Sequence, residues 1–149
     1  MAQPVTIGDL HFEPDTVSYG DEETLYLNLT NLTLLPQEFL IEIKIDYSIW
    51  PYLFWIPIYE SDYLDWFLFG DMYLNISVGY PILVFMPPGR YRFTLTIGNI
   101  GSGIWDKKTD FYDVTLLPGE MPEETDVGDK DLEEVKAFFQ KQFKNLFGN

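Results

Sequence analysis

The sequence predicts an all-β protein, an antiparallel β-sandwich of about seven strands, followed by a C-terminal amphipathic α-helix. Three observations lead to this prediction. Hydrophobic residues occupy every second position in much of the first 118 residues, as in strands with one buried face. Clusters of Gly, Pro, Asn and Asp separate these segments and indicate turns. A hydrophobic period of 3.6 residues appears near the C-terminus and predicts the helix.

The alternation locates the strands one by one. Seven segments show it: residues 5–12, 24–30, 38–46, 72–78, 82–86, 91–97 and 111–117. The pattern is clearest in the third segment, where Phe39, Ile41 and Ile43 alternate with polar and charged neighbours. Around Gly8 the alternation shifts by one residue, which predicts a β-bulge in the first strand. The glycines at residues 98–103 predict a hairpin between the last two strands.

Length and charge restrict the function. The chain has 149 residues and a formal net charge of −15, which suits one domain and would repel phosphate backbones. The longest strongly apolar stretch, residues 49–59, is far shorter than the roughly 20 residues of a membrane-spanning helix. The first residues lack the basic and apolar regions of a secretory signal peptide. No nucleic-acid partner and no membrane span are expected.

An aromatic insertion interrupts the strand pattern at residues 47–70. Ten aromatic residues lie between Tyr47 and Phe69, including three of the four tryptophans. Such an insertion either exposes a platform for a partner or packs its rings on its own sandwich. The candidate interaction residues in it are Trp50, Tyr52, Trp55, Tyr59 and Trp66.

The tail divides into an acidic linker at residues 119–128 and the helix at residues 129–149. Asp131 and Glu134 can form a capping box, and Gly148 suits a C-cap. The candidate interaction residues on the apolar face of the helix are Leu132, Val135, Phe139, Phe143 and Leu146. This face either docks on its own sandwich or packs against a neighbouring subunit, giving a homo-oligomer. Membrane-surface binding is least expected, because the polar face mixes Glu with Lys and the attached domain is acidic.

Several short motifs resemble immunoglobulin-like domains of the CARDB type from prokaryotic surface proteins. The opening residues 5–10 with Pro14, then Gly20-Asp21 before the second strand, resemble the start of such domains, and residues 88–91 resemble the turn before their penultimate strand. The resemblance covers residues 4–117 and implies an immunoglobulin-like sandwich over residues 1–118. It also implies a tyrosine corner at Tyr91, a cell-surface or extracellular location, and a non-enzymatic adhesion or assembly role.

Few residues are suited to catalysis. The chain has no Cys, so thiol nucleophiles and thiolate metal sites are excluded, and its single histidine, His11, is interpreted as structural. Glu60, Asp62 and Asp65 in the aromatic insertion could serve as the carboxylates of a glycoside hydrolase, but solubilising the insertion explains them more simply. No cofactor and no metal are expected.

We therefore expect a non-catalytic interaction, adhesion or assembly module. It would bury aromatic and helix-borne apolar surface against a protein partner or a second copy. The alternative is a carbohydrate-binding module that uses Trp50, Trp55 and Trp66 as a platform, and a carboxylate-based glycoside hydrolase ranks third.

Overall fold

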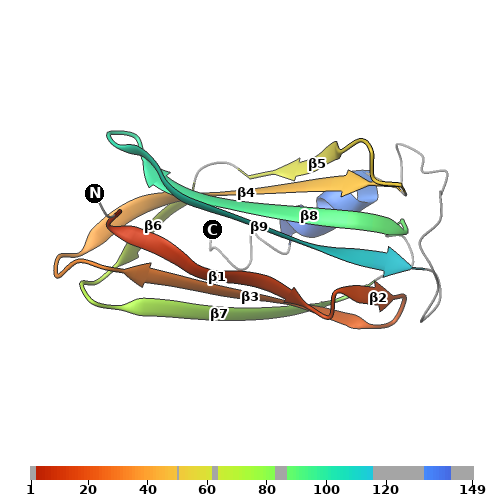
Figure 1. Cartoon of the computed structure of the whole chain (residues 1–149), viewed down its shortest axis with the longest axis horizontal. Helices are drawn as coiled ribbons and strands as arrows, with labels where there is room; N and C mark the ends of the chain where they lie inside the picture. The colour runs from red at the N-terminus through yellow and green to blue at the C-terminus, as the bar shows by residue number, and fades with distance from the viewer. Residues whose placement is uncertain (1–2, 50, 62–63, 83–86, 116–132, 142–149) are drawn as a thin grey trace.

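The computed structural model describes residues 3–49, 51–61, 64–82, 87–115 and 133–141. These residues form nine strands and one helix (Figure 1). The strands are β1 (Val5–Glu13), β2 (Thr16–Ser18), β3 (Glu22–Asn31), β4 (Gln37–Ser48), β5 (Ile56–Glu60), β6 (Leu64–Leu68), β7 (Tyr73–Pro81), β8 (Gly89–Asn99) and β9 (Gly103–Thr115). The helix covers residues 133–141. Within this part of the chain no helix is long and apolar enough to cross a membrane.

The strands make two sheets that pack face to face (Figure 1). The small sheet has the order β1-β3-β7, and the large sheet has the order β2-β9-β8-β4-β5, with β6 also paired to β4. Only the short β2 runs parallel to its neighbour, β9. The predicted all-β sandwich with a C-terminal helix is confirmed. The described residues hold nine strands rather than about seven: six of the predicted segments correspond to strands, and β2, β5 and β6 were not predicted.

The predicted alternation matches the buried faces. Leu25, Leu27 and Leu29 of β3 are at most 4% exposed, and the alternate residues Phe39, Ile41, Ile43 and Ile45 of β4 are buried in the same way. The register between β1 and β3 shifts between Ile7 and Asp9, where the sequence predicts a bulge. The predicted strand at residues 82–86 differs: Ile82 lies beyond the end of β7, and residues 83–86 are outside the described part.

The aromatic insertion contributes two strands to the edge of the large sheet. β5 pairs with the end of β4 and β6 with its beginning, so both extend the sheet beyond β4. Each supplies a core side chain, since Ile58 and Leu68 are 4% and 6% exposed. Burial of these two side chains favours the strands over an open loop.

The C-terminal helix lies across the gap between the sheets. The ring of Phe139 packs 5.8 Å from that of Tyr80 in the small sheet, and 6.2 and 5.4 Å from those of Tyr91 and Phe93 in the large sheet. Val135 and Phe139 are fully buried. The helix therefore completes the hydrophobic core. The predicted linker at residues 119–128 lies outside the described residues.

Two tyrosines fasten the turn before β8. Tyr91 donates a hydrogen bond from its hydroxyl to the carbonyl oxygen of Pro87, at 2.7 Å and fully buried. The hydroxyl of Tyr47 donates to the carbonyl oxygen of Pro88. The Tyr91 bond runs back to the turn that precedes its own strand, which is the geometry of a tyrosine corner.

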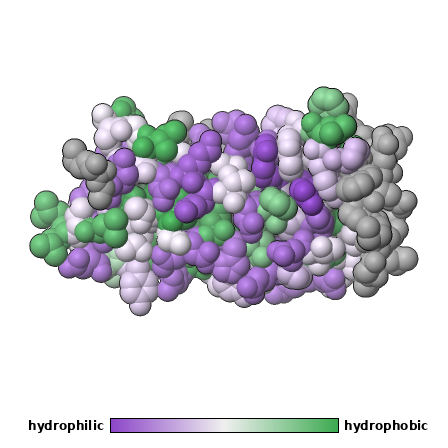
Figure 2. All heavy atoms as spheres, in the orientation of Figure 1, coloured by the Kyte–Doolittle hydropathy of each residue, from purple (hydrophilic) through white to green (hydrophobic). Residues whose placement is uncertain are grey.

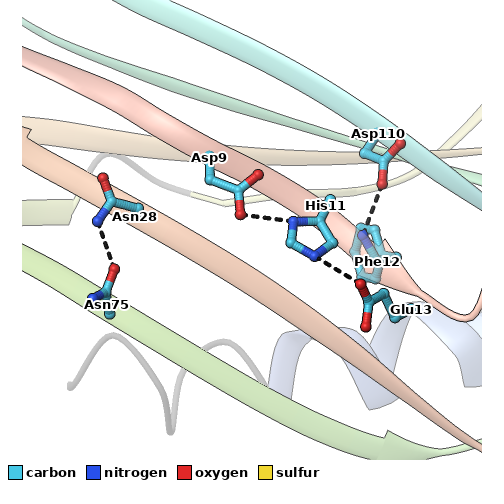
Figure 3. Close-up of polar contacts among 7 residues, drawn as sticks. All are labelled: Asp9, His11, Phe12, Glu13, Asn28, Asn75 and Asp110. Atoms are coloured by element: carbon cyan, nitrogen blue, oxygen red, sulfur yellow. Dashed lines mark hydrogen bonds and ion pairs between the residues drawn. The ribbon is translucent and has the colours of Figure 1, made fainter.

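Two aspartates of β9 join the large sheet to the edge of the small one. Asp106 accepts a hydrogen bond from the backbone nitrogen of Ile7 at 2.7 Å, and Asp110 accepts one from that of Phe12 at 2.8 Å (Figure 3). These carboxylates satisfy backbone donors that an edge strand otherwise leaves to solvent. These two backbone donors of β1 are therefore not free to pair with another strand.

Candidate functional site

Large hydrophobic side chains are exposed at one end of the sandwich. The turn between β3 and β4 carries Leu32, Leu34 and Leu35, which are 54%, 81% and 69% exposed. The end of β6 and the turn into β7 carry Phe67, Phe69 and Met72, which are 47% to 60% exposed. We call these six residues the apolar end. Figure 2 shows hydrophobic residues at the left-hand end, where Figure 1 places the β3–β4 turn.

A buried asparagine holds the two turns of the apolar end together. Asn31 is 1% exposed, and its Nδ2 donates to the carbonyl oxygens of Leu35, Leu68 and Phe69 at 3.0 to 3.1 Å. Its Oδ1 accepts from the backbone nitrogen and the hydroxyl of Thr33 at 2.9 and 2.8 Å. One side chain thus fixes the backbone on both sides of the apolar end.

Backbone contacts tie the same turns more closely. The backbone nitrogen of Asp71 donates to the carbonyl oxygen of Thr33 at 2.8 Å. A Cβ at Gly70 would lie 2.1 Å from the carbonyl oxygen of Leu34, so the approach requires glycine. The leucines and phenylalanines of the apolar end are therefore exposed on a preformed backbone.

We expect the Asn31→Ala substitution to destabilise the fold by roughly 2 kcal/mol, because it leaves buried carbonyl groups without a donor. Asn75→Ala is the matched control, since Asn75 is exposed on β7 and its loss should change stability by less than about 0.5 kcal/mol. Urea unfolding measures both. Equal midpoints for the two variants would contradict the bracing role of Asn31.

A groove lies beside the apolar end on the outer face of the large sheet. Its cavity volume is about 630 Å³, and Leu40, Ile100 and Ile104 are among its apolar lining residues. A second hollow of about 260 Å³ shares Leu40, Asp65 and Ile100 with it. The two hollows therefore adjoin each other over β4 and β6, and the larger one is of the size that accommodates ligands or peptide side chains.

A β-bulge shapes the wall of this groove. The register between β8 and β9 shifts between Ile97 and Gly98, and bulges bend a strand pair locally. A Cβ at Gly98 would lie 2.2 Å from the carbonyl oxygen of Gly103, so the strands approach closely there. The hairpin curls away from the sheet at the upper left of Figure 1. It leaves Ile100 92% exposed beside the groove.

The groove carries more negative than positive groups. Glu42, Asp65 and Lys107 line its main hollow, and Glu38 lines the second one. Ion pairs found within the described residues involve other groups, at His11, Arg90 and Arg92. The apolar floor with three carboxylates and one amine suits a ligand that combines aliphatic and basic groups.

The structure places two of the predicted aromatic contact residues on the arginines of β8. The guanidinium carbon of Arg90 lies 4.1 Å from the ring centroid of Tyr52, and that of Arg92 lies 4.1 Å from the ring centroid of Trp55. Arg92 also forms an ion pair with the buried Asp46 at 2.9 Å. One face of each ring is thereby covered by a cation.

The other predicted aromatic residues that the structure describes, Tyr59 and Trp66, are not fully exposed. Tyr59 and Trp66 are partly buried and pack against the core, and Trp50 lies outside the described residues. Trp66 lies on β6 opposite Phe39 of β4, in contrast to Trp55, which precedes β5. Because Trp50 lies outside the described residues, the structure does not test whether Trp50, Trp55 and Trp66 form the predicted platform.

Two of the predicted contact residues of the helix lie in the core rather than at the surface. Val135 and Phe139 were predicted as contact residues, but both are 0% exposed and pack between the two sheets. This correction has a physical reason: the three-stranded sheet does not cover the rings of the larger sheet, and the helix does. Leu132, Phe143 and Leu146 lie outside the described residues.

His11 lies in a polar cluster on the outer face of the small sheet (Figure 3). Its Nδ1 is 2.7 Å from Asp9 and its Nε2 is 3.3 Å from Glu13, and its ring stacks on that of Tyr26. The hydrogen bond with Asp9 and the charges of Asp9 and Glu13 raise the pKa of His11. The arrangement is a surface ion cluster, as expected for a structural histidine.

Of the three candidate carboxylates of a hydrolase, the structure describes two. Glu60 and Asp65 are exposed on two separate strands, β5 and β6, and Asp62 lies outside the described residues. No group of three His, Asp or Glu side chains in the described ranges is arranged to hold a metal ion.

Sequence reasoning missed the apolar end and the groove. The signal was present in part, because Leu32, Leu34 and Leu35 occupy a predicted turn, where polar residues are more common. Ile100 likewise lies within the predicted hairpin. The many aromatic residues at 47–70 led instead to the prediction that the contact surface lies in the insertion.

No protein-family model and no curated protein matches the chain. Solved structures do match it. The Pseudomonas fluorescens alkylpurine DNA glycosylase AlkC, bound to DNA containing an abasic site analog, has a TM-score of 0.56 and 16% identity over 77% of this chain and 31% of that one. The sporulation control protein Spo0M from Bacillus subtilis has a TM-score of 0.54 and 10% identity over 79% of this chain and 51% of that one.

The fold is an immunoglobulin-like β-sandwich. A CARDB domain from Pyrococcus furiosus has a TM-score of 0.45 and 11% identity over 77% of this chain and 94% of that one. The chain spans about a third of the AlkC chain and about half of the Spo0M chain. At these identities the likeness concerns the fold alone.

Proposed function

We propose that this immunoglobulin-like domain is a non-catalytic protein-interaction module, and that it binds its partner through the apolar end and the adjoining groove. One observation carries the proposal: Leu34 and Leu35, 81% and 69% exposed, lie on a backbone that the buried Asn31 holds in place. Exposed apolar groups on a preformed backbone lose little conformational entropy on binding.

The groove indicates the chemistry of the partner. Leu40, Ile100 and Ile104 offer aliphatic contacts, and carboxylates outnumber amines around them. A protein segment with aliphatic side chains flanked by Lys or Arg would match both features. The formal charge of −15 on the whole chain would further attract a basic partner.

A carbohydrate ligand has less support. Arg92 covers one face of Trp55, and Trp66 packs partly against the core. Sugar-binding platforms need exposed ring surface, and these contacts reduce the ring surface that Trp55 and Trp66 present to solvent.

A matched pair of substitutions tests the proposed surface. Leu34 and Leu53 are 81% and 72% exposed, but Leu53 lies after the far end of β4. In host cells, a photo-cross-linking residue at position 34 should capture a protein that the same residue at position 53 does not. Leu34→Asp should weaken binding of that purified protein at least tenfold in calorimetry, and Leu53→Asp should not.

Two results would refute the proposal that the partner binds through the apolar end. One is equal capture from positions 34 and 53. The other is a purified partner whose affinity is unchanged by Leu34→Asp.

A further inference from the structure

β7 forms an open edge of the small sheet. Among the described residues it pairs with one strand, β3, and their register runs without a shift from Glu22–Pro81 to Thr30–Tyr73. The carbonyl oxygen of Met72 accepts from the backbone nitrogen of Asn31 at 2.9 Å, so the backbone of Met72 faces β3. Alternate residues of an antiparallel strand direct their backbone groups to the same side. The residues that direct theirs to the open side are therefore Tyr73, Asn75, Ser77 and Gly79.

The other edges of the two sheets are protected. β1 is bulged near Gly8, and Asp106 and Asp110 accept hydrogen bonds from its backbone. β2 has three residues, and β5 and β6 have five each, with Pro57 inside β5. Short strands, bulges, prolines and charges are the means by which natural proteins block edge pairing. β7 has nine residues, no charged residue and no proline before its last position.

The inner face of β7 is incompletely covered. Leu74, Ile76 and Val78 are only partly buried, whereas their partners in register on β3 are at most 4% exposed. Coverage of the core therefore decreases at β7. A further strand beside β7 would cover these three side chains and satisfy the open backbone groups.

We infer that β7 pairs in antiparallel fashion with β7 of a second copy of this chain, joining two three-stranded sheets into one. The strand is complementary to itself: Leu74, Ile76 and Val78 of each copy would lie on the same inner face. It is also uncharged in a chain of net charge −15, so this edge brings copies together without placing like charges opposite each other. Figure 1 shows β7 along the lower margin of the molecule.

Sedimentation equilibrium of the full chain tests the inference. We expect a dimer of twice 17.4 kDa that dissociates on dilution. Ser77→Pro removes a backbone donor from the open side without removing one that faces β3, so it should raise the dimer dissociation constant at least tenfold. Ser77→Ala keeps the donor and is the matched control. A monomer at all concentrations, or a dimer equally tight in both variants, would overturn the inference.

Cross-linking gives a second measurement that does not depend on proline being tolerated. The chain has no Cys, so Ser77→Cys introduces a single thiol on β7, and Thr109→Cys introduces one on the exposed face of β9. A short bismaleimide should link the Ser77→Cys copies far more efficiently. Equal yields of cross-linked dimer for the two variants would contradict pairing through β7. Leu34→Asp should leave the dimer unchanged, which separates this interface from the apolar end.

Discussion

Replacing Phe139 with alanine should destabilise the protein by about 3 to 5 kcal/mol. The Phe139 ring is fully buried and contacts aromatic rings of both sheets, Tyr80 on one side and Tyr91 and Phe93 on the other. Its removal leaves a cavity at the junction of the two sheets and the helix, where rings from different elements cannot readily collapse together. Urea unfolding at one pH measures the effect.

Phe54→Ala is the control for Phe139→Ala. The side chain of Phe54 is 81% exposed, so its removal should change stability by less than about 0.5 kcal/mol. A loss below about 1 kcal/mol for Phe139→Ala would show that the helix is not docked in solution. The apolar face of the helix could then pack against a neighbouring subunit, which is the alternative that the sequence left open.

Stability should fall as the pH rises from about 4.5 to about 8, because of Glu23. Its side chain is fully buried, and neither carboxylate oxygen has a hydrogen-bond partner in the described structure. Burial, together with the charges of Asp15 and Asp110, raises the pKa of Glu23 from 4.5 to about 8. The folded state therefore keeps a proton that the unfolded state has already lost.

The sign and size of this effect follow from proton linkage. Between the two pKa values the folded state binds more protons than the unfolded state, so stability decreases with pH and levels off above about 8. A rise from 4.5 to about 8 corresponds to a loss on the order of 5 kcal/mol.

Glu23→Gln removes the titration while keeping the shape of the side chain. Denaturant unfolding at pH 5.5 and pH 8.5 should show Glu23→Gln about 1 kcal/mol more stable than wild type at the lower pH, and the difference should be several times larger at the higher one. Glu22→Gln is the control, because the neighbouring Glu22 is exposed. The raised pKa would be disproved if Glu23→Gln and wild type lost the same stability between these pH values.

Local alternation was sufficient to predict most of the sandwich. Ile41 and Ile43 of β4 point inward because successive side chains of a strand face opposite sides, whatever lies beyond. The same parity places Glu23 on the buried face with Leu25, so the sequence contained a signal for this buried carboxyl that was not used. The bulge near Gly8 was predicted for the same local reason.

The candidate site could not be predicted in this way. Exposure of Leu34 depends on two turns that are distant in sequence and are joined by Asn31. Trp55 resembles a surface platform in the sequence, but Arg92, 37 positions later, covers its ring. Such contacts depend on which strands become neighbours, and alternation carries no information on strand order.

The sequence by itself determined six of the nine described strands, their inner faces and an amphipathic C-terminal helix, because side-chain direction follows from backbone geometry within a few residues. The tertiary structure decided what those faces contact. It placed Val135 and Phe139 in the core, left β7 as an open edge and exposed the apolar end. The reason is that burial of an apolar face depends on the elements packed against it, and these lie far away along the chain.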